Sequence, residues 1–266
     1  MSPKPKKKPR NTSDGKDPER HIPFHFHGEA HAFSARFHRP IHIPIEAQAS
    51  VSLPTIGGHA RSRVENFVGD HLVRFKAAHS HVSGSWMDNK VATTHATASI
   101  EGLNILDFVT ADRIVARLTS EHAVGDPEGH FIALGSTFEG LKIAGHDVKV
   151  TLRHELFVEN RTFGALREQL AKDREPDKIT DITTDRVALC SLAEDIDVKF
   201  PGLKKRGHIL QIEHFGEIAI AEVFAAFGTR TLTMLRFRLG SPSGGSGTVT
   251  EATTNGQPAP PTPSGN

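Results

Sequence analysis

The sequence contains very little of several residue types that mark particular protein classes. Its 266 residues include one cysteine, one tryptophan and no tyrosine. A single cysteine excludes an intrachain disulfide, which fits a reducing compartment or a fold large enough to be stable without cross-links. Carbohydrate-binding and antibody-like surfaces rely on Trp and Tyr. Their scarcity argues against a sugar-binding platform, and the sixteen phenylalanines are expected in the core.

Long apolar runs and a net charge are also missing. No stretch has the length and hydropathy of a membrane span, and no apolar segment of a secretory signal follows the basic N-terminus. The cytoplasm is therefore the default location. The 32 basic and 31 acidic residues nearly cancel, so the chain as a whole has no field that attracts nucleic acid. Only the tail containing Lys6-Lys7-Lys8 is expected to contact phosphates, and then weakly.

Both ends of the chain are predicted to be disordered tails. Residues 1–21 are basic and polar, and residues 241–266 are almost entirely Gly, Ser, Thr, Pro, Asn and Ala. Neither stretch has the apolar surface needed to offset the entropy cost of ordering it. Residues 22–240 are therefore predicted to form a single β-rich domain, with a helical insertion near residues 161–186.

Most of this domain carries the period-two alternation of half-buried strands, beginning at residues 24–38. The exception is residues 163–173, where Phe163, Leu166 and Leu170 lie at helical spacing behind Thr162, a predicted N-cap. About a dozen short strands and one short helix predict a mainly β fold, an antiparallel sandwich or barrel.

A near-repeat recurs 38 positions apart. Residues 100–105 are Ile-Glu-Gly-Leu-Asn-Ile, and residues 138–143 are Phe-Glu-Gly-Leu-Lys-Ile. Both copies share the pattern apolar-Glu-Gly-Leu-polar-Ile, which predicts a strand with its glycine at a bend or bulge. The two copies predict a scaffold built from related hairpins.

Histidine is the main candidate for chemistry, with seventeen copies. His25, His27 and His31 fall on one face of a predicted strand, because alternate residues of a strand point the same way and lie about 7 Å apart. A second His-x-His pair is formed by His79 and His81. If the two strands are neighbours, the two groups would form a site for Zn²⁺ or Cu²⁺. In the alternative, these histidines are only the polar face of strands whose other face is buried.

No catalytic motif is present in the sequence. It contains no G-x-S-x-G elbow, no P-loop, no strand–GxGxxG–helix fingerprint and no H-E-x-x-H. Cys190 lies in an apolar, strand-like segment, which favours a buried inert thiol over a nucleophile. No catalytic or cofactor-binding residue is therefore predicted.

Several short segments resemble the bacterial choice-of-anchor P family. They are GEAHAFSA at 28–35, VSLP at 51–54, VTAD at 109–112 and GSTFEGL at 135–141. The block from residues 214–216 through 232–236 is similar to a group of uncharacterised bacterial proteins. Together these segments cover most of residues 28 to 240. The resemblance implies a β-rich scaffold without an established activity, and a surface or exported location in place of the cytoplasmic default.

The leading hypothesis is a non-enzymatic structural or interaction protein that self-associates as a homo-oligomer. Many short strands leave edges that must be covered or paired, and one route is strand addition from another copy. Phe24–Phe33 is the segment expected to pair between subunits. The alternative is a metal-binding protein or metal-dependent enzyme that uses the His-x-His pairs. A third hypothesis, small-ligand binding inside a barrel lined by phenylalanine, is compatible with the composition.

Overall fold

The computed structural model describes residues 24–39, 42–88, 90–126, 128–172, 181–182 and 186–258. The tail predicted over residues 1–21 and most of the insertion predicted beyond residue 172 lie outside them. Within the described residues the chain forms twenty strands and two helices, so the predicted mainly β class is confirmed. In this part of the chain, no helix has the length and hydropathy needed to cross a membrane.

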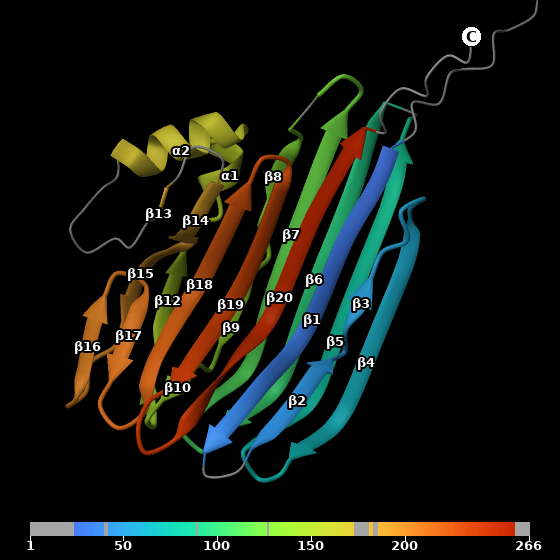
Figure 1. The fold of residues 1–266 in the computed structure, drawn as a ribbon. Helices are drawn as coiled ribbons and strands as arrows, with labels where there is room; N and C mark the ends of the chain where they lie inside the picture. The colour runs from blue at the N-terminus through green and yellow to red at the C-terminus, as the bar shows by residue number, and fades with distance from the viewer. Residues whose placement is uncertain are drawn as a thin grey trace, which may run out of the picture.

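The first of two large sheets, sheet A, has ten strands, and its main path runs β13-β14-β18-β19-β20-β1-β2 (Figure 1). These strands are β13 (Asp181–Ile182), β14 (Arg186–Ser191), β18 (Gly216–Ala226), β19 (Thr229–Leu239), β20 (Gly244–Pro258), β1 (Phe24–Arg39) and β2 (Ile43–Gln48). Short strands add to this path: β3 (Val51–Ser52) pairs with β1, and β17 (Ile209–Ile212) joins β16 (Leu203–Arg206) to β18.

The second sheet, sheet B, has eight strands, and its main path runs β11-β10-β7-β6-β5-β4. These strands are β4 (Gly58–Gly69), β5 (Val73–Met87), β6 (Val91–Ile105), β7 (Val109–Ala123), β10 (Lys142–Ile143) and β11 (His146–Asp147). Two further strands, β8 (His130–Ile132) and β9 (Thr137–Glu139), pair with β7. The strand pairs of both sheets are antiparallel.

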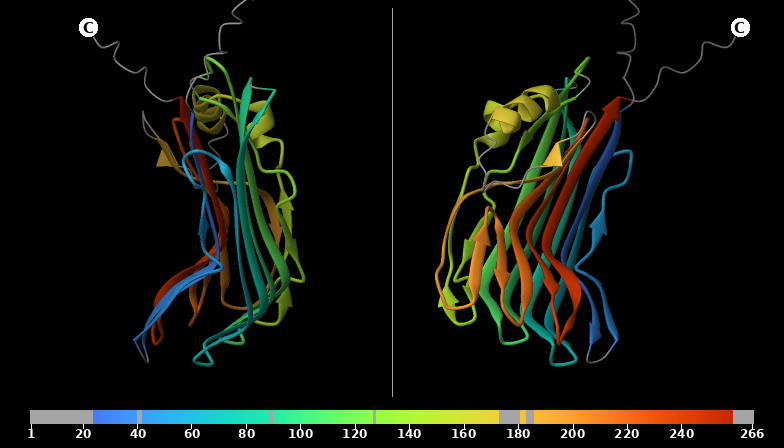
Figure 2. Two further views of the ribbon diagram at one scale, coloured as in Figure 1. Left: turned by 90° about the vertical axis from the view of Figure 1, so that its right-hand side faces the viewer. Right: turned by 60° about the vertical axis from the view of Figure 1, so that its left-hand side comes forward.

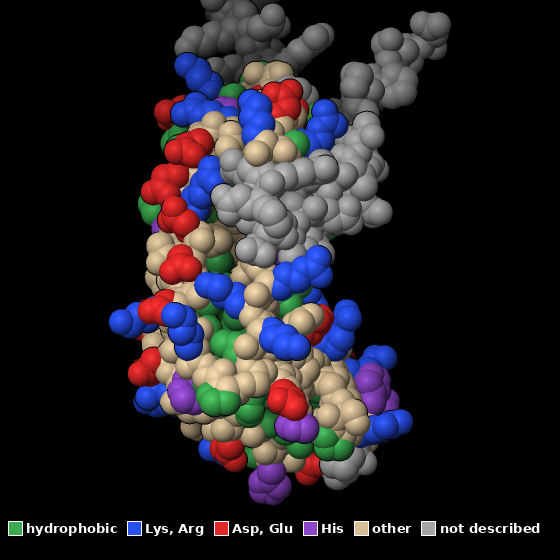
Figure 3. All heavy atoms as spheres, turned by 90° about the vertical axis from the view of Figure 1, so that its left-hand side faces the viewer, with side chains coloured by type: hydrophobic (Ala, Val, Ile, Leu, Met, Phe, Trp, Pro, Cys, Tyr) green, Lys and Arg blue, Asp and Glu red, His purple; other side chains and the backbone are tan. Residues whose placement is uncertain are grey.

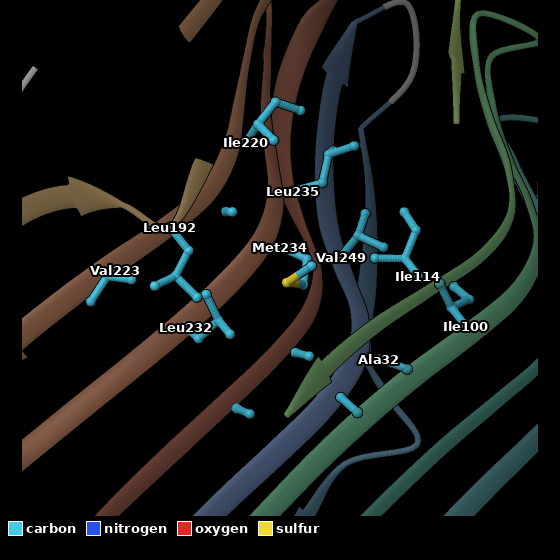
Figure 4. Close-up of a cluster of buried hydrophobic side chains, with 14 of the residues drawn as sticks. Ala32, Ile100, Ile114, Leu192, Ile220, Val223, Leu232, Met234, Leu235 and Val249 are labelled. Carbon is cyan, nitrogen blue, oxygen red and sulfur yellow. The ribbon is translucent and has the colours of Figure 1, made fainter. Parts of the chain in front are cut away.

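The two sheets face each other as a sandwich (Figure 2). Between them, side chains such as Ile100 and Ile114 of sheet B lie opposite Val249 and Leu235 of sheet A (Figure 4), and all four are fully buried. Burial of these apolar surfaces is the main source of stability for such a fold. The predicted sandwich arrangement is confirmed.

A small third sheet and two helices lie beside the sandwich, on the side of β14 (Figure 1). The sheet pairs β12 (Lys149–Leu152) with β15 (Ala193–Asp197). The helix predicted at residues 163–173 is confirmed as α2 (Phe163–Lys172), whose predicted core positions are buried. A second, four-residue helix, α1 (Leu156–Glu159), was not predicted. It has too few residues to show a helical period in the sequence.

Sheet B bends along a row of residues that crosses its strands. Asn66 on β4, Gly102 on β6 and Gly140 after β9 have positive φ angles of 50°, 62° and 59°. Strand register aligns these three residues. The neighbouring residue pairs place Asn66 and Gly102 opposite the same residue of β5, one from each side, and place Gly140 across β7 from Gly102. On the strands that cross this row, the buried positions switch from one parity to the other. Sheet A has an equivalent row, in which Ala221 and Thr250 have positive φ, and its bend is visible in Figure 2.

The near-repeat forms part of this bend in sheet B. Its two glycines, Gly102 and Gly140, are the positive-φ residues of β6 and of the segment that joins β9 to β10. Both copies pair with the same stretch of β7, one on each side of it. The predicted bend at glycine is therefore confirmed, and the hairpins that contain the two copies share β7.

The prediction of a disordered tail from residue 241 is wrong over most of its length. Residues Gly244–Pro258 form β20, which pairs with β19 on one side and β1 on the other. A Cβ at Gly247 would lie 2.5 Å from the Phe237 ring, and a Cβ at Gly256 would lie 2.2 Å from the Phe24 ring. The small residues that suggested disorder are therefore required, because rings from neighbouring strands lie over β20.

Candidate functional site

The segment Phe24–Phe33 was predicted to pair between subunits, and that prediction is wrong. It forms the first part of β1, which pairs with β20 along one edge. Its other edge is occupied by β3 and β2, and by backbone hydrogen bonds to Leu53 and Thr55. With both edges filled by its own chain, this segment has no free backbone to offer a second copy.

The histidines of β1 lie on the outer face of sheet A. His25 and His27 are exposed and alternate with the buried Phe24 and Phe26. His31 lies on the same face, with its Nε2 atom 3.0 Å from the Thr248 hydroxyl. These side chains form the polar face of a half-buried strand. This was the alternative to a metal site in the interpretation of the sequence.

His79 and His81 lie on β5, in the other sheet. They alternate there with the buried Ser80 and Val82, so they point away from the core on the outer face of sheet B. The two His-x-His groups are therefore on opposite sides of the sandwich, so the condition for a shared metal site, that their strands be neighbours, is not met. Among the described residues, no group of three or more His, Cys, Asp and Glu side chains is arranged to hold a metal ion.

His79 and His81 instead contribute to a groove on the outer face of sheet B. The groove has a volume of about 550 Å³ and crosses β4, β5 and β6. We call it the sheet B groove and define it by the six outward residues that line it: Arg61, Arg63, His79, His81, Thr97 and Ser99.

Strand register arranges the sheet B groove as two parallel rows. In the first row, Arg61 of β4 is opposite His81 of β5, which is opposite Thr97 of β6. In the second row, Arg63, His79 and Ser99 are aligned in the same way. Each row therefore presents a guanidinium, an imidazole and a hydroxyl on three neighbouring strands. The rows are two residues apart, which is about 7 Å along a strand.

The two rows of the groove differ in the charges around them. Arg63 contacts the Glu65 carboxylate on its own strand, whereas Arg61 forms no ion pair within the described residues. The first row continues onto β7 at Arg117, opposite Thr97, and the second continues at Val115, opposite Ser99. The first row is thus flanked by a guanidinium at each end, and neither row contains a carboxylate.

His95 lies next to His81 on this face, and its pKa is lowered. Burial is the main cause that lowers the pKa of His95, and the charge of Glu121 opposes it. The charges of His81 and Arg117 lower that pKa further. The side of the molecule at β16 is different, since basic and acidic side chains are mixed there (Figure 3), as in the ion pair of Lys205 and Asp195.

Of the residues that line the groove, the two histidines were predicted from the sequence, and the arginines and hydroxyls were not. A signal was present: Arg61-x-Arg63 and His79-x-His81 share the same spacing and fall on neighbouring strands. The two strands are joined by a hairpin about Gly69-Asp70. Whether the arginines and the histidines share one face depends on the register of that hairpin, and the register places Arg61 opposite His81. The hydroxyls of Thr97 and Ser99 have no distinctive pattern in the sequence.

Two other buried features, a cluster of charged side chains and a single thiol, serve the fold. On sheet A, Arg236 donates two hydrogen bonds to the buried Glu222 carboxylate, and His208 lies 3.3 Å from it. Burial alone would raise the pKa of Glu222, but these partners outweigh it and lower the pKa to about 2. The predicted buried thiol is confirmed, since Cys190 is 2% exposed and burial raises its pKa to about 12.

Comparison with known families matches the part of the chain that contains the sheet B groove. Residues 24–185 match the family described as a domain of unknown function (DUF8256). The chain belongs to this family. The DUF8256 match includes β1 and every strand of sheet B, with all six groove residues, and it ends before β18, β19 and β20. No curated protein and no solved structure matches the chain. The resemblance to the choice-of-anchor P family stays a prediction.

Proposed function

We propose that the protein is a non-enzymatic interaction protein that binds an anionic partner on the outer face of sheet B. The observation that supports the proposal is the sheet B groove, whose two rows combine arginine, histidine and hydroxyl side chains without a carboxylate. Guanidinium groups form strong, charge-assisted hydrogen bonds with phosphate and carboxylate oxygens. A surface with this charge attracts anions and excludes cationic partners.

The setting of the groove favours binding over chemistry. Arg61, Arg63 and His81 are exposed on the face of a sheet, where water has free access, whereas catalytic sites gain much of their electrostatic effect by excluding water. The sheet is also a rigid support. Both β5 and β6 are paired on each side over most of their length, which fixes the positions of the side chains that they carry.

Binding of a labelled polyanion tests this function. The probe is fluorescein-labelled long-chain inorganic polyphosphate, and the readout is fluorescence anisotropy at low and physiological salt. We expect wild-type protein to bind with an affinity that falls with salt. Arg61→Glu should weaken binding by about tenfold or more, because it reverses a charge in the first row. The matched control is Arg238→Glu, which makes the same charge change on sheet A. Absence of wild-type binding, or an equal loss in both variants, would refute the proposal.

Self-association through β4 is a second candidate function, favoured by the position of that strand. β4 has twelve residues and, among the described strands, pairs along only one edge, with β5. In an antiparallel pairing of two β4 strands, residues on the same face must be opposite each other. Of the registers centred on residues 61 to 65, only the one centred on Val64 avoids placing like charges opposite each other. It places Arg63 opposite Glu65 of the second copy.

A charge swap tests this pairing. If the pairing forms, wild-type protein is a dimer by size-exclusion chromatography with light scattering. Arg63→Glu should lower the fraction of dimer, and the double swap Arg63→Glu with Glu65→Arg should restore it. Val64→Cys should then form a disulfide-linked dimer, and the buried Cys190 does not compete with it. A wild-type monomer at all concentrations, or a double swap that fails to restore the dimer, would contradict self-association by this route.

A further inference from the structure

The two rows of the sheet B groove repeat the same three functional groups in the same strand order. Reading from β4 to β6, the first row has Arg61, His81 and Thr97, and the second has Arg63, His79 and Ser99. A single oxyanion needs only one such row. Two copies of the same donor set, side by side on one rigid sheet, indicate a ligand with two anionic groups.

We infer that the sheet B groove binds two phosphate groups of one ligand, one in each row, joined by a linker of a few atoms. The inference rests on the proposed function and names its ligand class. It is supported by the chemistry of the rows, by their spacing and by the difference between their flanking charges.

The chemistry of each row fits a tetrahedral phosphate better than a planar carboxylate. A guanidinium offers two parallel donors, which already satisfy both oxygens of a carboxylate. The imidazole and the hydroxyl on the next two strands are additional donors. A phosphate has further oxygens for them to reach. Neighbouring strands are about 4.8 Å apart, so donors from adjacent strands approach one group from different sides.

The spacing of the rows defines the distance between the two phosphates. His79 and His81 are two residues apart on β5, as are Arg61 and Arg63 on β4. Alternate residues of a strand lie about 7 Å apart. The two phosphorus atoms of pyrophosphate share a bridging oxygen and are too close to occupy both rows. Two phosphate esters on a short carbon linker have the required separation.

The flanking charges make the two rows unequal. The first row has an arginine at each end, Arg61 on β4 and Arg117 on β7. In the second row, Arg63 is already in contact with Glu65, and β7 contributes Val115. We therefore expect the first row to bind a single phosphate by itself. The second row adds affinity only when its phosphate is tethered to the first, because the tether raises the effective concentration.

A series of bisphosphates of increasing length tests the inference by isothermal titration calorimetry. The probes are inorganic phosphate, pyrophosphate and the bisphosphates of ethane-1,2-diol, butane-1,4-diol and hexane-1,6-diol. We expect affinity to peak at an intermediate linker and to exceed that of inorganic phosphate by about tenfold or more. The bis-sulfate of butane-1,4-diol is expected to bind more weakly than the bisphosphate, because it carries less negative charge.

Two variants separate the rows. Arg63→Gln should reduce the affinity of the best bisphosphate to that of inorganic phosphate and leave inorganic phosphate binding unchanged. Arg61→Gln should weaken both. Both residues are exposed on an edge strand, so neither change is expected to disturb folding. Equal affinity for all linkers, an unchanged linker profile in Arg63→Gln, or tighter binding of the bis-sulfate would overturn the inference.

The outcomes distinguish this inference from the proposed function. If polyphosphate binds and loses affinity in Arg61→Glu while the bisphosphate series shows no optimum, the two-phosphate inference is wrong and the anionic-partner proposal stands. If neither polyphosphate nor any bisphosphate binds, both are wrong.

Discussion

Arg113 lies between two glutamates that come from the two copies of the near-repeat. Its Nε atom is 3.9 Å from Glu101 Oε1, and its Nη1 atom is 3.8 Å from Glu139 Oε1. The contact follows from topology, because the two copies pair with β7 on opposite sides and both place their glutamate opposite Arg113. The repeat thus supplies a glycine for the bend and a carboxylate for the strand that it flanks.

Replacement of Arg113 should have only a small effect on stability. The three side chains of this ion-pair group are each about half exposed, and solvent screens exposed pairs. Arg113→Ala is therefore expected to lower the free energy of unfolding by less than about 1 kcal/mol. Urea denaturation measures this. A loss of more than about 2 kcal/mol would show that the group is more than an exposed ion pair.

Replacement of Gly140 should have a large effect. A Cβ at this position would lie 2.1 Å from Asp112 Oδ2, on a backbone with φ of 59°. Gly140→Ala is expected to cost about 1–3 kcal/mol in the free energy of unfolding, from the positive-φ penalty and from the shift that the new Cβ forces on the Asp112 side chain. Gly145→Ala is the matched control, since Gly145 also has positive φ and its Cβ would meet nothing within 4 Å. Equal losses in the two variants would contradict the packing argument.

Local pattern in the sequence was enough to predict these strands and their bend. Period-two alternation predicted the mainly β class, and the shared Glu-Gly-Leu pattern predicted a bend at Gly102 and Gly140, as their positive φ angles confirm. The helical spacing of Phe163, Leu166 and Leu170 predicted α2. In each case the signal lies within one element, where neighbouring residues determine the backbone conformation.

The composition of β20 is typical of a disordered segment although β20 is a paired strand, and glycine substitution there tests why its small residues are required. Gly247→Ala should destabilise the protein by about 2 kcal/mol or more, because the new Cβ would meet the Phe237 ring and the Ser34 carbonyl at 2.5 and 2.6 Å. Gly244→Ala on the same strand is the control, since its Cβ would have only ordinary contacts, at 3.8 Å. Thermal denaturation compares them. Equal melting temperatures would contradict the close packing of β20.

His122 should make stability depend on pH. Its side chain is 2% exposed between the sheets, and burial lowers its pKa from 6.5 to about 4. Between these pH values the unfolded chain binds a proton that the folded chain does not. Stability is therefore complete above about pH 6.5 and is lost as pH falls toward 4, by about 3 kcal/mol in all.

Comparison with a variant isolates the contribution of His122. Urea denaturation of wild type and His122→Leu at about pH 7 and about pH 4.5 should show a smaller loss in the variant, by about 2–3 kcal/mol. Glu222 titrates with a pKa of about 2, so most of its contribution is lost at lower pH. The same pH dependence in both proteins would show that His122 is not the group responsible.

Sequence reasoning recovered less of the candidate site, because the site depends on contacts between strands. His79 and His81 were identified from their spacing, but their supposed partner strand, β1, belongs to the other sheet. A period-two pattern shows which residues share a face and leaves open which strands are neighbours. The alignment of His81 with Arg61 and Thr97 follows from register, which a single sequence does not determine.

Anomalous diffraction from crystals soaked in tungstate, a tetrahedral dianion, shows whether the sheet B groove is an oxyanion site. We expect anomalous difference peaks in the groove, the stronger in the row of Arg61, His81 and Thr97 and a second about 7 Å away in the row of Arg63, His79 and Ser99. Peaks confined to other surfaces, with none in an accessible groove, would show that the groove is not an oxyanion site.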